Sequence, residues 1–384
     1  MTCVTEQTAI ETMALRILVG DDQADVRDAL RLLLKSNGYL VQTESCPEAV
    51  LNRARQDHFD LALLDMNYMR DTTSGREGID LITSLRAEHP ELPIVVMTAW
   101  GSVGLAVEAM QHGAVDFVEK PWSNQQLLDR VARHSSAFRQ RTEREVTDLQ
   151  KATAIQQRLL QSARTNVASV EAAGHCLMHS AIGGDAYDVF DLNGGSVVLA
   201  LADVSGKGTG AALLMAHLLG LLRTECRIYS DDLVGALSAV NRGLFNATSD
   251  AQFATLFLGV YNSRTGVLRY INCGHPPALI ARNDQSIEKL SSNALMIGLF
   301  SNWQAAEASV QLNPGEVLLL YSDGATEACN DAGLEFGEDR LAEVLKYGRT
   351  LPVERLLSAS VEAVRTHCRG TPQDDVTMLA FRPK

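Results

Sequence analysis

Two patterns of apolar and polar residues divide the chain. Between residue 16 and about residue 136, short apolar strands alternate with amphipathic helical patterns. Five such strand–helix units predict an α/β domain with a doubly wound, five-stranded parallel sheet. The expected strands are 17–19, 40–41, 61–64, 94–97 and 117–118, and the expected helices are 25–37, 47–56, 77–89, 102–112 and one that begins after Pro121.

From about residue 166 to the end, the pattern is rich in strands. Long helical patterns interrupt these strands at 210–223, 233–245 and 352–367. Strands that pack on strands, with helices outside them, predict an α+β sandwich of antiparallel sheets. The expected strands are 196–202, 253–261, 267–272, 278–281, 317–321 and 376–381.

The segment between these regions is polar and helix-forming, without Gly or Pro from Ala137 to Thr165. Its thin apolar stripe, which includes Val146 and Leu149, predicts a helical or coiled-coil signalling linker that continues the fifth helix and pairs in a homodimer. The expected organisation is therefore a disordered tail at 1–14, an α/β domain at 15–136, a linker at 137–165 and an α+β domain at 166–384.

Composition narrows the class of partner. The formal net charge of −13 opposes binding to nucleic acid or to an anionic membrane. Seven scattered cysteines without a C-x-x-C pair indicate reduced thiols in a cytoplasmic protein. The longest apolar stretch, 211–222, is too short to cross a bilayer.

Polar residues stand at the ends of the amino-terminal strands. Asp21 and Asp22 end the first, Asp65 the third, Thr98 the fourth and Lys120 the fifth. In a parallel sheet these ends meet at one edge. Each residue alone could be a turn or surface residue, but five together favour phosphoryl transfer, in which a carboxylate attacks while a hydroxyl and a lysine bind the phosphoryl oxygens.

These positions resemble the receiver domain of two-component response regulators. The matching motifs are Asp21-Asp22, Leu64-Asp65, Met97-Thr98-Ala99 and Glu119-Lys120-Pro121. The resemblance implies that a sensor histidine kinase phosphorylates Asp65 and that Phe117 switches position with Thr98. It implies a Mg²⁺ ion held by Asp22, Asp65 and the backbone carbonyl of Asn67, with Asp21 assisting. The loop 67–75 is longer than usual in this family and lacks its Met-Pro.

Four acidic motifs carry the chemistry of the second region. Each places a carboxylate, that of Asp185, Asp203, Asp323 or Asp374, at the end or edge of an apolar run. Carboxylates at close quarters stay ionised only beside a cation, and all-oxygen ligation suits Mg²⁺ or Mn²⁺. A two-metal carboxylate site that activates water can hydrolyse phosphate esters.

Together these motifs resemble the PPM family of metal-dependent serine/threonine phosphatases, in its bacterial sporulation and stress-response branch. The resemblance implies that Asp203 bridges two Mn²⁺ or Mg²⁺ ions. It also implies that Asp323 and Asp374 complete one metal site and that Asp185 and the Val204 carbonyl complete the other. The neighbouring Asp188 and Asp375 are expected to orient these ligands by hydrogen bonds, with direct metal ligation as the alternative. The matching segments are 155–160, 183–188, 203–208, 253–255, 273–277, 321–324 and 374–377.

The expected function is a response regulator whose output is a protein phosphatase acting on a phosphorylated anti-anti-sigma factor. The alternative is a pseudophosphatase adaptor that binds a sigma-factor regulator, although such proteins lose metal carboxylates that are present here. A DNA-binding output is disfavoured because no basic helix-turn-helix is present. His275, in a Gly-His-Pro-Pro turn, is expected to be structural, and the pattern identifies no general acid.

Overall fold

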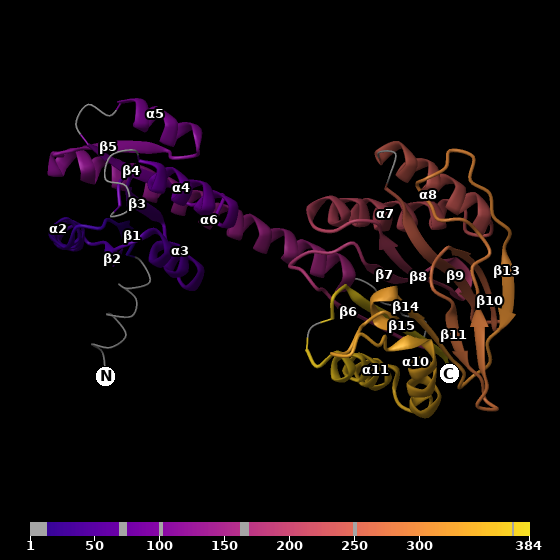
Figure 1. The fold of residues 1–384 in the computed structure, drawn as a ribbon. Helices are drawn as coiled ribbons and strands as arrows, with labels where there is room; N and C mark the ends of the chain where they lie inside the picture. The colour runs from indigo at the N-terminus through magenta and orange to yellow at the C-terminus, as the bar shows by residue number, and fades with distance from the viewer. Residues whose placement is uncertain (1–13, 69–74, 100–102, 162–168, 249–251, 371) are drawn as a thin grey trace, which may run out of the picture. The chain divides into compact units, whose positions relative to one another are not determined.

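The computed structural model describes residues 14–68, 75–99, 103–161, 169–248, 252–370 and 372–384 (Figure 1). It divides within one helix, α6 (Asn124–Gln161), into a first unit that ends at Thr147 and a second that begins at Asp148. The expected tail lies outside the described residues except for Ala14, as do positions 69–74 of the long loop and 162–165 of the linker.

A five-stranded sheet in the order β2-β1-β3-β4-β5 forms the centre of the first unit. All its strand pairs are parallel, which confirms the predicted α/β fold class. The strands are β1 (Arg16–Gly20), β2 (Leu40–Glu44), β3 (Leu61–Asp65), β4 (Ile94–Ala99) and β5 (Asp116–Lys120). The helices before α6 are α2 (Ala24–Ser36), α3 (Pro47–Gln56), α4 (Arg76–Glu88) and α5 (Val103–Gln111).

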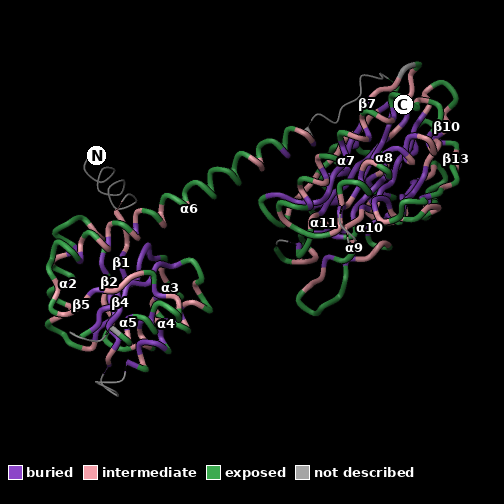
Figure 2. The backbone as a smooth tube through the Cα atoms, turned by 90° about the horizontal axis from the view of Figure 1, so that it is seen from above, coloured by how far each residue is buried: buried purple, intermediate pink, exposed green. Residues whose placement is uncertain are grey.

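Successive residues of each strand face opposite sides of this sheet, so the unit has two cores. Leu18 of β1 packs in the core that contains residues of α3, α4 and α5. Its neighbours Ile17 and Val19 pack in the core that contains residues of α2 and α6. Figure 2 shows the buried strands between layers of helix whose outer faces are exposed.

Helix α6 is anchored in each unit by different residues. In the first unit, Nη2 of Arg139 lies 2.6 Å from Oδ2 of Asp60, whose side chain is buried ahead of β3. In the second unit, Leu160 is buried in the main apolar core. Residues 143–150 between these anchors are exposed (Figure 2).

Two five-stranded antiparallel sheets build the second unit, which confirms the predicted sandwich. The first sheet has the order β13-β10-β9-β8-β7 and the second has the order β12-β11-β14-β15-β6. The strands are β6 (Val170–Leu177), β7 (Ala186–Asp191), β8 (Ser196–Val204), β9 (Ala254–Asn262), β10 (Val267–Cys273), β11 (Ala278–Ala281), β12 (Ile287–Leu290), β13 (Ala308–Gln311), β14 (Val317–Tyr321) and β15 (Val376–Pro383).

Helices cover the outer faces of both sheets. On the first sheet lie α7 (Thr209–Ile228) and α8 (Leu233–Ala247), which begins where the Asp232 carboxylate accepts a hydrogen bond of 2.8 Å from the Gly235 amide. On the second lie α10 (Gly337–Gly348) and α11 (Val353–Cys368). Among the described helices, none combines the length and apolarity needed to cross a bilayer.

Candidate metal centres

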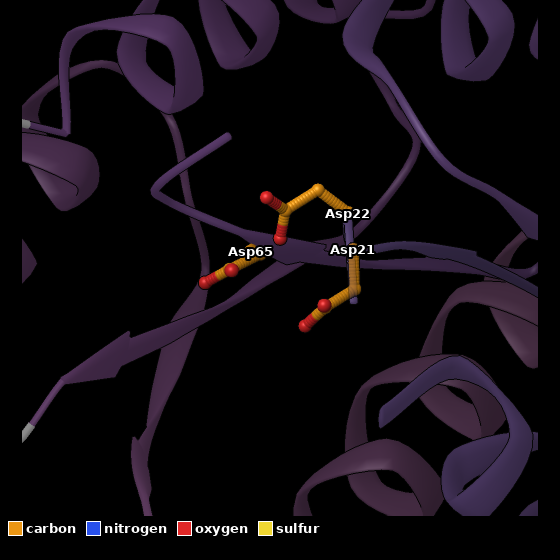
Figure 3. Close-up of side chains that lie close together, drawn as sticks. All are labelled: Asp21, Asp22 and Asp65. Carbon is orange, nitrogen blue, oxygen red and sulfur yellow. The ribbon is translucent and has the colours of Figure 1, made fainter. Parts of the chain in front are cut away.

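Three carboxylates meet at the carboxyl edge of the parallel sheet. Asp21 and Asp22 directly follow β1, and Asp65 is the last residue of the neighbouring strand β3. Each offers an oxygen within 4.8 Å of the other two, and Figure 3 shows the three groups gathered beyond the strand ends. Because these are hard oxygen donors, the trio suits Mg²⁺.

Lys120, at the end of β5, completes this centre. Its Nζ lies 2.8 Å from Oδ2 of Asp21 and 3.0 Å from Oδ2 of Asp65. Burial acts to lower the pKa of Lys120, but the two carboxylates outweigh it and raise that pKa. Burial also raises the pKa of Asp65, and the Lys120 ammonium opposes that rise. The lysine therefore helps to keep the carboxylate of Asp65 ionised.

The other predicted receiver residues lie on the same sheet or beside it. Thr98 is buried near the end of β4, and Phe117 is half-buried on β5 with the Arg130 guanidinium 5.4 Å from its ring centre. Asn67 lies two residues beyond Asp65, and its buried side-chain Oδ1 has no hydrogen-bond partner.

Asp203 is the centre of a second group of carboxylates, in the sandwich. It is the penultimate residue of β8, and burial together with Asp323 and Asp374 raises its pKa to about 6. Asp185, directly before β7, is only 3% exposed, and burial and Asp203 raise its pKa well above the usual value. The structure therefore brings together the four aspartates that the sequence singled out.

Two glycines allow the close approach of the segments that carry these aspartates. A Cβ atom on Gly184 would lie 2.6 Å from the carbonyl oxygen of Val204. A Cβ atom on Gly324 would lie 2.2 Å from the carbonyl oxygen of Asp375. Both distances are too short for any other residue, so the tight packing of the acidic motifs requires glycine at these two positions.

The donor set around Asp203 fits hard divalent cations. Oδ2 of Asp185 is buried without a hydrogen-bond partner, an arrangement that costs free energy unless a cation or water satisfies it. In the described part of the chain, only the receiver trio forms a group of three carboxylates within 4.8 Å.

The two residues expected to orient metal ligands have different partners. Oδ2 of the buried Asp188 lies 2.6 Å from Nε of the half-buried Arg223 on α7, and the two side chains form an ion pair within the sandwich. Asp375 instead accepts a hydrogen bond of 2.7 Å from the backbone amide of His179. Asp375 thus restrains the segment that leads to Asp185.

Two polar residues at this centre received no role from the sequence. Nζ of Lys207 lies 3.0 Å from Oδ2 of Asp374 and is an exposed cation beside the acidic group. Gln156, near the end of α6, is buried and bonds both backbone groups of Gly183: its Nε2 donates to the carbonyl at 2.7 Å, and its Oε1 accepts from the amide at 3.2 Å. Lys207 stands in the matching segment 203–208 and Gln156 in the matching segment 155–160, but the resemblance assigned a role to neither residue.

Comparison with known proteins identifies both halves. Residues 17–132 match the response regulator receiver domain, and residues 193–384, half of the chain, match the family of stage II sporulation protein E (SpoIIE). Protein IcfG of Synechocystis sp. is 32% identical over 230 residues, which cover 52% of this chain and 36% of IcfG. FixJ of Bradyrhizobium diazoefficiens is 38% identical over 124 residues, which cover 32% of this chain and 57% of FixJ.

Solved structures agree with this assignment. The RsbU and RsbW domains of Rv1364c from Mycobacterium tuberculosis are 29% identical with a TM-score of 0.50, over 56% of this chain and 60% of that one. The SiaA-PP2C domain of Pseudomonas aeruginosa shares the fold, with 19% identity, a TM-score of 0.56, and coverage of 63% of this chain and 99% of that one. The chain belongs to the SpoIIE family, and it carries a response regulator receiver domain ahead of its PP2C-type domain.

Proposed function

We propose that this protein is a metal-dependent serine/threonine phosphatase whose activity is controlled by phosphorylation of Asp65. The observation that carries the proposal is the convergence of Asp185, Asp323 and Asp374 on Asp203, whose pKa is raised by burial and by the charges of Asp323 and Asp374. A pseudophosphatase adaptor is disfavoured because a protein that only binds a partner gains nothing from burying carboxylates that repel one another.

The sandwich residues have separate roles in this mechanism. Asp203 would contact two ions, Asp323 and Asp374 would hold one, and Asp185 with the Val204 carbonyl would hold the other. When bound, Mn²⁺ or Mg²⁺ ions supply an activated water and neutralise charge on the phosphoryl group. Lys207, beside Asp374, is placed to bind a phosphoryl oxygen. Asp375 and Gln156 restrain the segment ahead of Asp185.

The receiver residues perform a phosphoryl transfer of their own. Asp65 would attack the phosphoryl group on the histidine of a sensor kinase, so that an acyl phosphate forms on Asp65 while the phosphorus–nitrogen bond to the imidazole breaks. Asp21, Asp22 and Asp65 would hold a Mg²⁺ ion, which when bound would balance the added negative charge. Lys120 and Thr98 then bind the transferred oxygens. The receiver family match supports this role, because receivers take phosphoryl groups from such donors.

The proposed substrate is a phosphoserine on a small anti-anti-sigma protein, whose dephosphorylation releases a sigma factor. The SpoIIE family match and the likeness to a structure containing an RsbU domain support this choice. The formal net charge of −13 is also poorly suited to nucleic acid as a direct target.

Helix α6 is the proposed connection between receiver and phosphatase. Leu127 and Val131 of α6 are buried in the receiver core. At the other end, Thr153 Oγ1 donates to the Ala181 carbonyl at 3.0 Å, and Gln156 bonds Gly183, two residues before Asp185. Phosphorylation of Asp65 would change pairing between the α6 helices of two copies and so shift the Asp185 segment.

Apolar exposure supports pairing through α6. Val146 is 50% exposed and Leu149 is 40% exposed on the stretch between the two anchors. Their spacing of three residues places them on one helix face. A second copy of the helix would remove both side chains from water.

The full chain with Mn²⁺ is expected to release phosphate from a phosphorylated anti-anti-sigma protein and to stop in chelator. Asp203→Asn should lower the rate by several orders of magnitude, because it weakens the ligand shared by both ions. Exposed Asp331→Asn serves as the control. Tight binding of the phosphoprotein by the wild type without phosphate release would establish the adaptor instead. Release from an unrelated phosphoprotein alone would refute the substrate but not the chemistry.

Without metal, Asp203→Asn is expected to stabilise the fold. The pKa of Asp203 is about 6 in the folded chain against an ordinary value of 3.8. The folded state therefore binds the proton more tightly, and stability falls as pH rises from about 4 to 6 and stays low above that range. In EDTA at pH 7.5 the free energy of unfolding of the variant should exceed that of the wild type by about 1 to 3 kcal/mol. Below pH 4 the two free energies should be equal. Thermal unfolding across pH measures this, and a gain that does not depend on pH contradicts it.

Asp65 should take up a phosphoryl group from acetyl phosphate in a Mg²⁺-dependent reaction. Asp65→Asn removes the nucleophile and should abolish labelling, whereas Asp80→Asn on the exposed face of α4 should not. Lys120→Ala should permit some labelling but weaken the response of the phosphatase. Mass spectrometry locates the acyl phosphate, and its detection on another residue would refute the assignment.

Three glycines inserted after Thr147 should uncouple Asp65 phosphorylation from phosphatase activity while leaving basal turnover intact, because they break α6 where it is exposed. The matched control inserts seven helix-forming residues at the same point, which changes the helical phase by only about 20°. That control should keep the response. A glycine variant that still responds fully would show that the receiver and phosphatase surfaces communicate by direct contact.

A further inference from the structure

His275 is a buried histidine to which the proposed mechanism gives no role. It lies in the Gly-His-Pro-Pro turn between β10 of the first sheet and β11 of the second, where the chain crosses the sandwich. Only 3% of it is exposed, and burial lowers its pKa to about 3. The imidazole is therefore neutral at physiological pH and acts as a fixed hydrogen-bonding group.

One side of the ring bonds the strand next to Asp203. Nδ1 of His275 lies 2.9 Å from Oγ1 of Thr255 on β9. Thr255 is the direct partner of Asp203 in the β8–β9 ladder. His275 thus bonds the residue that pairs directly with Asp203, the proposed bridging carboxylate.

The other side of the ring faces the strand that leads to Asp323. The backbone of Tyr321, the last residue of β14, lies close enough to the imidazole to oppose the lowering of its pKa by burial, and Nε2 of His275 is buried without a hydrogen-bond partner. Asp323 follows two residues later. If Thr255 donates its hydroxyl proton to Nδ1, Nε2 carries the proton of the neutral ring and can act only as a donor, for which the Tyr321 backbone is the neighbour identified above.

The side chain of Asn272 fixes the turn that carries the His275 ring. The amide of His275 donates to Oδ1 of Asn272 at 2.8 Å. The side-chain amide of Asn272 donates to the carbonyls of Pro276 and Leu290, each at 3.3 Å. Asn272 is fully buried, so water does not compete for these bonds.

We propose that His275 is a positioning residue that sets the spacing between Asp203 and Asp323 across the two sheets and thereby the affinity of the site for divalent metal. The inference rests on the proposed function, since it concerns the same carboxylates. It adds a bridge between the sheets, formed by Thr255, the imidazole and the Tyr321 backbone.

The test is the affinity of the full chain for Mn²⁺, measured by calorimetry, together with thermal unfolding in EDTA. Thr255→Val keeps the side-chain shape and removes the hydroxyl, and His275→Phe keeps a ring and removes both nitrogens. Each should weaken Mn²⁺ binding at the sandwich site by about 10- to 100-fold, the usual effect of losing a group that orients a metal ligand. The double variant should bind no more weakly than the weaker single variant, because both act through one bridge.

Two matched variants separate positioning from general damage. His275→Gln retains an N–H that can reach toward Tyr321 and should recover part of the affinity. His367→Phe removes a histidine that bonds the Leu334 carbonyl near the end of α11, and it should leave Mn²⁺ binding unchanged. Asp65 labelling by acetyl phosphate should be normal in all variants, because it reports on the other unit.

Unchanged Mn²⁺ affinity in folded Thr255→Val overturns the inference, even if His275→Phe fails to fold. The inference is also overturned if the His275 and Thr255 variants unfold at a lower temperature in EDTA but bind Mn²⁺ as tightly as the wild type. That result would show that these residues contribute only to packing. If the wild type binds no Mn²⁺ at the sandwich site, the proposed function falls and this inference falls with it. If the wild type binds tightly and the variants bind equally tightly, only this inference falls.

Discussion

Repulsion between like charges held out of water is the constraint on which the rest of this structure depends. In each unit the chain gathers carboxylates at strand ends, where burial and neighbouring charge both oppose ionisation. In the receiver, Lys120 offsets this repulsion directly. Around Asp203, Lys207 lies only at the exposed rim beside Asp374, and the remaining charge raises the pKa of Asp203. The apolar cores of the sheets must hold these groups together against that repulsion until a cation binds.

Sequence reasoning succeeded where apolar residues were continuous and ended at a chemically distinctive residue. The strand 61–64 is entirely buried and ends at Asp65. Both the strand and the functional residue at its end could therefore be predicted. The same holds for β14, which is buried throughout and leads directly to Ser322 and Asp323. Helix α8 was predictable because its buried residues recur with helical spacing after Asp232. The convergence of the acidic motifs followed from resemblance to a family, because their separation along the chain carries no distance information.

The elements that were not predicted lack such continuous patterns. Strand β6 has the sequence VEAAGHCL, in which small and polar residues interrupt the apolar ones, and it is mostly half-buried. Strands β12 and β13 are edge strands of four residues with exposed positions. Helix α10 is a charged surface helix with few buried residues. The clamp of Gln156 on Gly183 could not be predicted because a polar residue in a polar helix looks solvated. The unit boundary falls inside α6, where the sequence pattern is uniform and marks no division.

Strands β8 and β9 are buried on both faces over most of their length. Apolar burial therefore does little to choose between alternative alignments of the two strands, because a slip by one residue exchanges one buried apolar side chain for another. Polar contacts at one end of the pair make that choice. Ser205 and Phe253 exchange two hydrogen bonds of 2.9 Å just beyond the last ladder pair, and a slip of β8 along β9 would separate these two residues. The groups that surround the metal centre thus also specify how the central strands align, so a misaligned sandwich would keep its core and lose its chemistry.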